Sequence, residues 1–257
     1  MSDTTINRGE SNKRDRLRAN GTMPPPQNVR YEMKLVTQGM AYKRVLTELR
    51  LHKCALRTLH PSRRVQSVYL DTHDGRALQE NLAGASERQK VRFRWYGDDT
   101  GSVRGTLERK IRLNMLGWKE TYHYTKALLV EGASRFAFMR SLLDGVPPRF
   151  RSVLEEGLEP VQWITYTRDY LTTADGSVRV TIDHDIRCSD QRDRAVLSMR
   201  YTTPTPNMTI VECKAPQDRY DALRNLLNSM PLVVDKCSKF VIASDPPSAP
   251  IVSMIPD

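Results

Sequence analysis

The fold is decided by residues 87–96, which read Glu87-Arg88-Gln89-Lys90-Val91-Arg92-Phe93-Arg94-Trp95-Tyr96. Val91, Phe93 and Trp95 recur at every second position, which is the period of a β-strand with one face in a core. The opposite face carries a row of cations about 7 Å apart along the strand. Cations in a row repel one another unless they face water or an anion. The stretch therefore predicts a half-buried strand whose basic face lies in solvent or against an anionic ligand.

The same alternation of apolar and charged residues recurs along the chain. Further strands are predicted for residues 30–36, 66–71, 103–112, 118–124, 161–172, 178–187 and 209–215. Helices are predicted for residues 42–52, 75–84, 134–157 and 222–230. The pair Asp175-Gly176 predicts a hairpin turn between two of the strands.

A single sheet with one solvent-exposed face would not need this many charged strand faces, because exposed strand faces favour threonine and mixed polar residues. If the charged faces all point inward, the strands close into a barrel with a polar interior that is open at its ends. The sequence thus predicts an α+β fold, a β-barrel with flanking helices. Its interior cations would be Arg30, Lys34, Arg88, Lys90, Arg92, Arg94, Lys110, Lys119, Arg168, Arg179 and Lys214. Its interior acids would be Glu32, Glu108, Asp183, Asp185 and Glu212.

An interior of this composition favours a multiply charged anion. Two cations about 4 Å apart repel by roughly 4 kcal/mol at an effective dielectric constant near 20, and such an anion relieves the repulsion. Arginine forks suit phosphate oxygens. Carboxylates in the same cavity suit Mg²⁺ or Mn²⁺, which bridges to the phosphate. The combination predicts a metal–polyphosphate site and phosphoryl transfer.

Composition agrees with an anionic partner, since the formal net charge is +10. Nucleic acid is not the expected partner, because no aromatic stacking series accompanies the basic strands and the glutamates would repel a phosphate backbone. No apolar run approaches the roughly 18 residues of a membrane span, and no signal peptide is visible, so we expect a cytoplasmic protein without a membrane span. The dispersed cysteines are expected to be reduced thiols.

The two ends of the chain differ in composition from the segments with strand and helix patterns. Residues 1–28 are polar and basic and run through Pro24-Pro25-Pro26, so they are predicted to form a disordered leader. Residues 246–257 are rich in proline and are predicted to form a disordered tail. One ordered domain is therefore expected between them, over residues 29–245.

Short motifs spread over this domain carry a family resemblance. They are Glu32-Met33-Lys34, Arg88-x-Lys90-x-Arg92-x-Arg94, Leu107-Glu108-Arg109-Lys110, Tyr166-x-Arg168-x-Tyr170, Arg179-Val180-Thr181-Ile182-Asp183, Val211-Glu212-Cys213-Lys214 and Ser238-Lys239-Phe240. Each motif is weak alone, but in this order they resemble the VTC domain. That domain is the polyphosphate polymerase branch of the triphosphate tunnel metalloenzymes, in the CYTH-like superfamily.

The resemblance implies an eight-stranded antiparallel tunnel that binds ATP or another nucleoside triphosphate and a divalent metal, Mn²⁺ or Mg²⁺. Members of this branch transfer the terminal phosphate of ATP to a growing chain of inorganic polyphosphate. By position, the residues expected in catalysis are Lys34, Arg92, Arg94, Lys110, Arg168 and Glu212. Those expected to hold nucleotide and phosphates are Arg88, Lys90, Arg92, Arg94, Lys119, Arg168, Arg179, Lys214, Ser238 and Lys239, the last two near the tunnel mouth. Glu212 is expected as the main metal ligand, with Glu32, Glu108 and Asp183 as further candidates.

Two alternative functions use the same tunnel. Hydrolytic relatives, of the adenylate cyclase and thiamine triphosphatase types, begin with a Glu-x-Glu-x-Lys strand, whereas this sequence has Arg30 at the first position. That departure favours the polymerase. An inorganic or nucleotide triphosphatase would depend more on a water-activating acid such as Glu108. A non-catalytic module would only bind polyphosphate or nucleotide.

Overall fold

The computed structural model describes residues 30–38, 40–113, 116–204, 208–230, 232 and 238–244. The leader expected at 1–28 and the tail expected at 246–257 lie outside these residues. Within the described ranges, no helix combines the length and the hydropathy that a membrane span requires.

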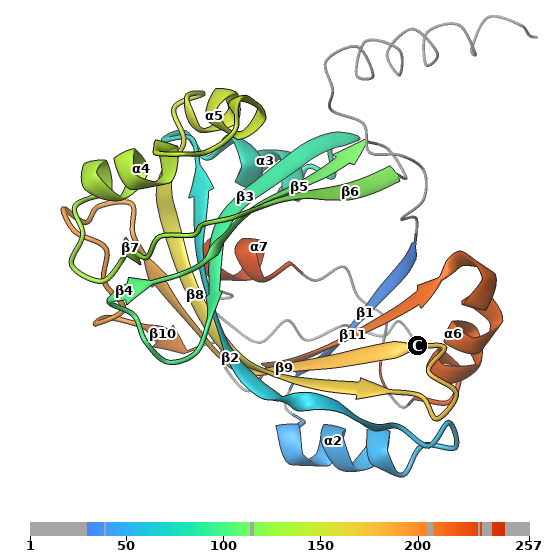
Figure 1. Ribbon diagram of the computed structural model, residues 1–257. Helices are drawn as coiled ribbons and strands as arrows, with labels where there is room; N and C mark the ends of the chain where they lie inside the picture. Colours follow the sequence, from blue (N-terminus) through green and yellow to red (C-terminus); the bar gives the residue numbers. More distant parts are fainter. Residues whose placement is uncertain are drawn as a thin grey trace, which may run out of the picture.

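One antiparallel sheet organises the fold, with its main strands in the order β1-β11-β9-β8-β2-β3-β5-β6 (Figure 1). These strands are β1 (Arg30–Gln38), β2 (Arg57–Asp71), β3 (Glu87–Tyr96), β5 (Thr106–Leu113), β6 (Leu116–His123), β8 (Glu159–Thr172), β9 (Arg179–Asp190) and β11 (Met208–Pro216). The short β10 (Thr203–Pro204) pairs with β9, and β4 (Ser102–Val103) pairs separately with β7 (Leu128–Leu129). The predicted α+β class with an eight-stranded antiparallel sheet is confirmed.

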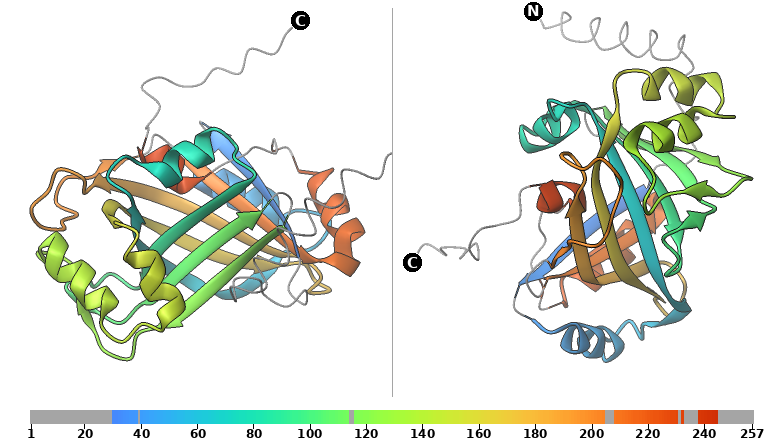
Figure 2. Two further views of the ribbon diagram at one scale, coloured as in Figure 1. Left: turned by 90° about the horizontal axis from the view of Figure 1, so that it is seen from above. Right: turned by 90° about the vertical axis from the view of Figure 1, so that its left-hand side faces the viewer.

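The sheet curls strongly, so that its two ends turn toward each other (Figures 1 and 2). Its edge strands β1 and β6 do not pair with each other within the described ranges. The barrel predicted from the sequence is therefore a curled half-barrel with an inner and an outer face.

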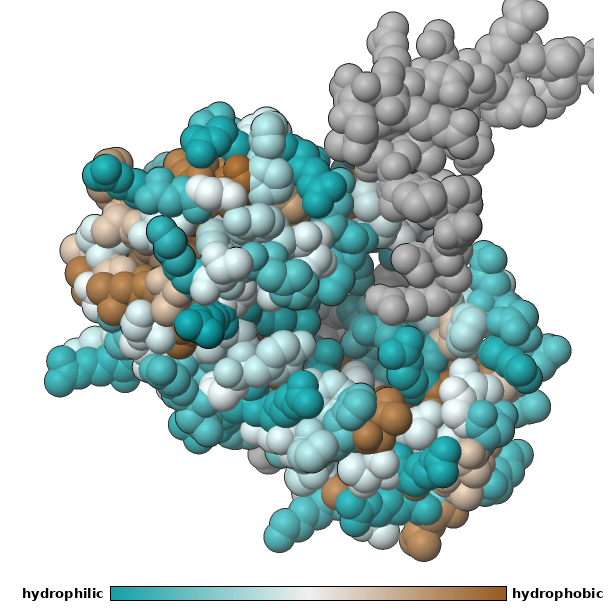
Figure 3. All heavy atoms as spheres, viewed as in Figure 1, coloured by the Kyte–Doolittle hydropathy of each residue, from teal (hydrophilic) through white to brown (hydrophobic). Residues whose placement is uncertain are grey.

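Helices cover the outer face because the apolar residues of the strands point there. On one half, Trp95 and Trp163 meet with ring centroids 5.5 Å apart and join a core with Phe138 of α4 (Arg135–Leu143) and Phe150 of α5 (Pro148–Leu154). On the other half, α2 (Tyr42–Arg50) and α6 (Tyr220–Leu227, preceded by the 3₁₀ turn Gln217–Arg219) bury their apolar stripes against β1, β9 and β11. The side of the molecule shown in Figure 3 is consequently mostly hydrophilic.

The inner face is divided into an apolar part and a charged part. Two short helices, α3 (Arg76–Leu82) and α7 (Lys239–Ser244), pack on the apolar part, and both lie toward one end of the curl (Figure 2). Phe240 of α7 stacks on Tyr69 of β2 with ring centroids 5.1 Å apart. The remaining inner face carries the charged side chains.

Candidate functional site

Strand pairing brings the predicted charged faces together on the inner side of the curl. Residues directly opposite each other in antiparallel strands project to the same face. In this register Arg92 lies opposite Glu108, and Arg168 lies opposite Asp183. The predicted residues that gather on this face are Glu32, Lys34, Lys90, Arg92, Arg94, Glu108, Lys110, Lys119, Arg168, Asp183, Glu212 and Lys214.

Glu108 is a buried carboxylate surrounded by cations. Arg92 approaches one carboxylate oxygen with Nε at 2.8 Å and Nη2 at 2.6 Å, and Lys119 Nζ lies 2.9 Å from the other. Arg94 adds a contact at 3.7 Å. Burial raises the pKa of Glu108, but these cations outweigh it and hold the pKa well below its ordinary value. Glu108 therefore fixes the orientation of two guanidinium groups that face the interior.

Asp183 organises a second group of charges and has no exposed surface. Arg168 donates to both of its oxygens, with Nε at 2.5 Å and Nη2 at 2.7 Å, and Lys239 of α7 also ion-pairs with it. Arg168 additionally reaches Glu212, at 3.7 Å. Burial raises the pKa of Asp183, but Lys239 and Arg168 outweigh it, and the pKa is lowered. Asp183 thus anchors cations, and both of its oxygens are occupied.

A third group, the basic cluster, contains more cations than nearby carboxylates can compensate. It consists of Lys34, Arg88, Lys90, Arg92 and Lys110, which come from β1, β3 and β5. Burial and the charges of the other four members lower the pKa of Lys90 to about 7. Burial is the larger cause, and the four neighbouring cations act in the same direction because each disfavours a further positive charge. The basic cluster is therefore suited to a polyanion.

Residues around α7 support the basic cluster from one side. Lys90 donates a hydrogen bond of 2.6 Å to Ser238 and lies 5.8 Å from the ring centroid of Phe240. Lys239, with its ammonium 4.8 Å from the ring centroid of Tyr166, extends toward Asp183. Ser238 and Lys239, which we expected near a tunnel mouth, are thus integrated with the inner face.

Two tyrosines belong to the site although the sequence analysis assigned them no role. The hydroxyl of Tyr69 accepts a hydrogen bond of 2.9 Å from Arg92, and that of Tyr166 accepts one of 2.7 Å from Arg94. Burial raises the pKa of Tyr166, but Arg168 and Arg94 outweigh it and lower the pKa. The Tyr-x-Arg-x-Tyr alternation on β8, which places Tyr166 and Arg168 on one face, was a signal for this role.

Two carboxylates on neighbouring strands could hold a metal ion. The side chains of Glu32 on β1 and Glu212 on β11 contact each other, and the ammonium group of Lys214 lies 3.9 Å from Glu32 and 3.1 Å from Glu212. Burial raises the pKa of Glu212, but Lys214, whose ammonium is 3.1 Å away, and other neighbours hold it well below its ordinary value. The described residues include no cluster of three or more potential metal ligands. The pair fits Mg²⁺ or Mn²⁺ that takes its other ligands from phosphate and water.

Other predicted residues lie at the margins of the inner face. Arg88 is half-buried and donates to the backbone carbonyl of Ala85. Arg179 is exposed at the start of β9, opposite Lys214 on β11. The side chain of Arg30 lies outside the described part of the structure.

Asp185, which the sequence analysis placed in the interior, lies on the outer face, so that expectation was wrong. It ion-pairs with Arg64 at 2.8 Å and with Arg187 at 3.2 Å. Its φ angle of 49° belongs to a bulge, where the register between β8 and β9 shifts. An extra residue in one strand reverses the inward and outward positions beyond it.

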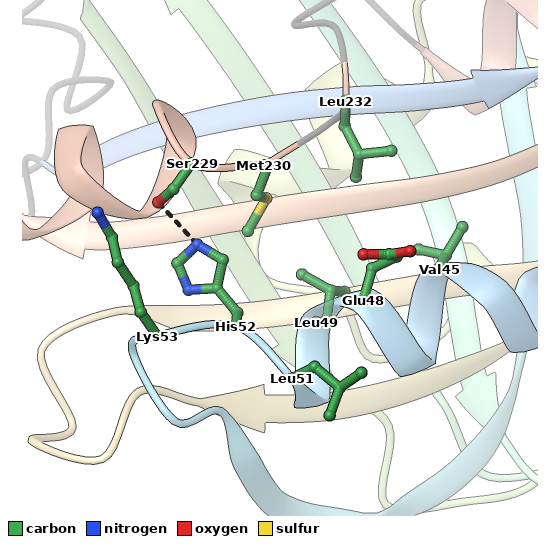
Figure 4. A pocket seen from close by; sticks show the side chains of 9 residues that line it. All are labelled: Val45, Glu48, Leu49, Leu51, His52, Lys53, Ser229, Met230 and Leu232. Carbon is green, nitrogen blue, oxygen red and sulfur yellow. Dashed lines mark hydrogen bonds between the residues drawn. The ribbon is translucent and has the colours of Figure 1, made fainter.

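A separate cavity of about 270 Å³ lies between α2 and α6, on the outer side of the sheet (Figure 4). Its walls are Val45, Glu48, Leu49, Leu51, His52, Lys53, Ser229, Met230 and Leu232. His52 accepts a hydrogen bond from the backbone N–H of Cys54 at Nδ1, so Nε2 donates to the hydroxyl of Ser229, 2.8 Å away. With only one lysine and mostly apolar walls, this cavity lacks the charge of the inner face.

Comparisons with known proteins identify the family of this chain. The profile of the VTC domain family matches residues 29–245. An X-ray structure of a Vibrio parahaemolyticus protein designated an adenylate cyclase aligns with a TM-score of 0.47 and 15% identity, over 84% of this chain and 97% of that chain. A search among curated protein sequences gives no match. Because the family profile spans most of its length, the chain belongs to the VTC domain family.

Proposed function

We propose that this protein is a metal-dependent phosphotransferase of the polyphosphate polymerase type, which moves the terminal phosphate of ATP onto a polyphosphate chain. The observation that carries the proposal is the basic cluster, where burial and neighbouring cations lower the pKa of Lys90 to about 7. A polyphosphate ligand replaces repulsion among these cations with attraction. Membership of the VTC family supports ATP and polyphosphate as the anions.

The transfer step needs little beyond positioning and charge neutralisation. A terminal phosphate oxygen of the acceptor chain attacks the γ-phosphorus of ATP. The bond between that phosphorus and the β–γ bridging oxygen breaks as the new P–O bond forms, so that ADP leaves and the chain grows by one phosphate. Both reactants are anions, so the protein must hold them together against their mutual repulsion.

The ion pairs of the inner face give the cations fixed orientations for this task. Arg92 and Arg94 are held by Glu108, and Arg168 is held by Asp183. A guanidinium group that is already oriented loses less conformational entropy when it binds a phosphate oxygen. The Nε atom of Arg94 is buried without a hydrogen-bond partner in the described structure, an exception among buried donors.

A divalent cation fits beside this array. Glu212 and Glu32 would hold it, since their carboxyl groups are in contact and lie next to the basic cluster. When bound, the ion would neutralise charge on the phosphates it bridges. Glu108 and Asp183, the other predicted ligands, have both oxygens in close contact with arginine and lysine, whereas the ion pairs of Glu212 and Glu32 in the described structure are longer, at 3.1 to 3.9 Å.

The state of the carboxylates supports transfer rather than hydrolysis. A hydrolase needs a group that takes a proton from water, and such a base works best when its pKa lies near neutrality. The pKa values of Glu108, Asp183 and Glu212 are instead lowered by the surrounding cations, although burial alone would raise them. The anionic oxygen of a phosphate chain attacks without giving up a proton, so transfer makes no such demand.

The direct test is incubation of the purified protein with ATP and Mn²⁺, followed by separation of the products by chain length on a gel and assay of free phosphate. Polyphosphate chains together with ADP would support the polymerase. Free phosphate without polymer would assign hydrolysis instead. Tight triphosphate binding without turnover would leave a binding module.

The metal role has its own variant. Glu212→Gln should abolish metal-dependent turnover while much of the affinity for triphosphate remains, because a neutral amide binds Mn²⁺ poorly. Glu120→Gln is the matched control, since Glu120 lies on the other face and pairs with Arg109 at 3.6 Å. Unchanged turnover in Glu212→Gln would remove Glu212 as the metal ligand.

A further inference from the structure

Four side chains form an aromatic and cationic cluster, the rim cluster, near one end of the inner face. It consists of His60 and Arg63 on β2, Tyr96 on β3 and Tyr170 on β8. The guanidinium carbon of Arg63 lies 5.8 Å from the ring centroid of Tyr96 and 5.9 Å from that of Tyr170. His60 meets Tyr170 edge to face, with centroids 5.7 Å apart. Arg63 is thus shared between two tyrosine rings.

Packing within the protein does not account for these residues. Tyr96 keeps 53% of its surface exposed, and Arg63 and His60 are exposed as well. In the part of the chain that the structure describes, no carboxylate forms an ion pair with Arg63. An accessible guanidinium beside two aromatic faces offers both stacking surface and hydrogen-bond donors to a planar ligand.

The rim cluster is continuous with the phosphate-binding residues. Tyr96 follows Arg94 by two residues on the same face of β3, and Tyr170 follows Arg168 in the same way on β8, a step of about 7 Å. Arg94 also contacts Tyr96 directly, with its guanidinium carbon 6.0 Å from the ring centroid. A ligand whose phosphates rest on Arg94 and Arg168 therefore has its next chemical group at the rim.

An unsatisfied polar atom lies beside the same cluster. Thr181 stands opposite Tyr170 in the pairing of β8 with β9, so it projects to the inner face. Its hydroxyl oxygen is buried and has no hydrogen-bond partner in the described structure. Buried polar groups are normally hydrogen-bonded, and an exception of this kind points to a partner supplied by a ligand or water.

We propose that the rim cluster is the nucleobase subsite of the donor nucleotide, with the base stacked against Tyr96 and Tyr170. This inference rests on the proposed function, because it presumes a nucleoside triphosphate on the inner face with phosphates at Arg94 and Arg168. Stacking accepts any base, since every base has a π-face. The subsite would therefore bind nucleotides in general and distinguish them from inorganic triphosphate, which has no base.

The test compares two ligands that share their phosphates. Dissociation constants of the β,γ-imido analogue of ATP and of inorganic tripolyphosphate are measured by calorimetry at fixed ionic strength. Tyr96→Ala should weaken binding of the nucleotide by about tenfold, the loss of one base–aromatic stack, and leave that of tripolyphosphate unchanged. Tyr96→Phe should retain wild-type affinity, because the ring and not the hydroxyl provides the stacking surface.

Tyr201→Ala is the matched control. Tyr201 is also exposed and also has an arginine over its ring, with the guanidinium carbon of Arg194 at 5.2 Å, but it lies in the segment between β9 and β10 and not on a main strand of the sheet. It should alter neither affinity. Arg63→Ala gives a second variant at the rim and should weaken nucleotide binding selectively.

Three other results of this experiment would overturn the inference. If Tyr96→Ala weakens both ligands equally, Tyr96 supports the phosphate site and no base subsite exists there. If Tyr96→Ala affects neither ligand, although the wild type binds both, the nucleobase subsite fails while the proposed function stands. If the wild-type protein binds neither ligand, the proposed function and the subsite fail together.

Discussion

The ammonium group of Lys110 on β5 lies 3.3 Å from the carboxylate of Glu32 on β1, although these strands stand near opposite ends of the sheet order. The curl therefore brings the two ends of the sheet together through side chains where the backbones do not pair. Glu32 also contacts Lys34 at 3.5 Å and Lys214 at 3.9 Å. Glu32 thus contacts both a lysine from near the far end of the sheet and two lysines on β1 and β11.

This contact should contribute little to stability. The side chain of Lys110 is 55% exposed, and exposed ion pairs contribute about 0.2–1 kcal/mol. A double-mutant cycle with Glu32→Gln and Lys110→Met, followed by urea denaturation, should give a coupling energy in that range that decreases in high salt. A coupling of several kcal/mol, or one insensitive to salt, would show that the curl depends on this pair.

Asp183 should matter far more to stability than Asp185, two positions along the same strand. Asp183→Asn leaves Arg168 and Lys239 largely buried with only a neutral partner, a change that costs about 3–5 kcal/mol in comparable ion pairs. The side chain of Asp185 is 39% exposed, so Asp185→Asn should cost about 1 kcal/mol or less. Chemical denaturation of both variants measures the difference. Similar losses would contradict the anchoring role of Asp183.

Strand positions were predictable where alternation is strict and local. Residues 87–96, chosen from their period of two, coincide with β3 as observed. Asp185 was predicted on the wrong face because β9 has a bulge in its pairing with β8. The alternation of apolar and polar residues in the sequence does not reveal such a bulge. The first half of β2 was missed because Arg57 to Arg64 is exposed and shows no apolar alternation. Pro61 falls at a register shift in that half.

The charged composition of the site followed from the sequence, but its division into groups did not. Which carboxylate neutralises which cation depends on the curl and on α7, a short helix whose Phe240 and Lys239 meet the inner face from a distant part of the chain. Nothing local in that helix identifies its packing partners. The basic cluster, which shares Arg92 with the group around Glu108, can therefore be recognised only from the three-dimensional structure.

The lowered pKa of Lys90 should make stability depend on pH. The unfolded chain binds a proton at Lys90 up to about pH 10.5, whereas the folded protein releases it near pH 7, so this group adds stability as pH rises between those values. Lys90→Met should therefore raise the melting temperature at pH 6, with a smaller advantage at pH 9, and should weaken triphosphate binding. Lys126→Met, at an exposed loop position, should show no such pH dependence. A variant less stable than wild type at pH 6 would contradict this prediction.

Glu108 competes with a bound polyanion for the same cations, so Glu108→Gln should have opposite effects on the free and the liganded protein. Without the carboxylate, Arg92, Arg94 and Lys119 repel one another, and the free protein should lose about 3–5 kcal/mol of stability. Triphosphate should then bind more tightly, because no internal counter-ion must be displaced from the guanidinium groups. Tripolyphosphate should raise the melting temperature of this variant more than that of the wild type.

The same variant separates transfer from hydrolysis. If Glu108 activated water, Glu108→Gln would abolish release of free phosphate from ATP and Mn²⁺ while leaving the shift in melting temperature intact. With the carboxylate engaged by three cations and its pKa held low by them against the effect of burial, we expect phosphoryl transfer to persist in the variant, slowed only by the looser orientation of Arg92. Glu120→Gln, on the opposite face, should change neither the melting-temperature shift nor the turnover, since its partner Arg109 does not reach the inner face. If ligand binding instead raised the melting temperature of Glu108→Gln less than that of the wild type, the result would contradict the prediction. It would show that the main effect of Glu108 is to position the cations for phosphate, not to compete with phosphate for them.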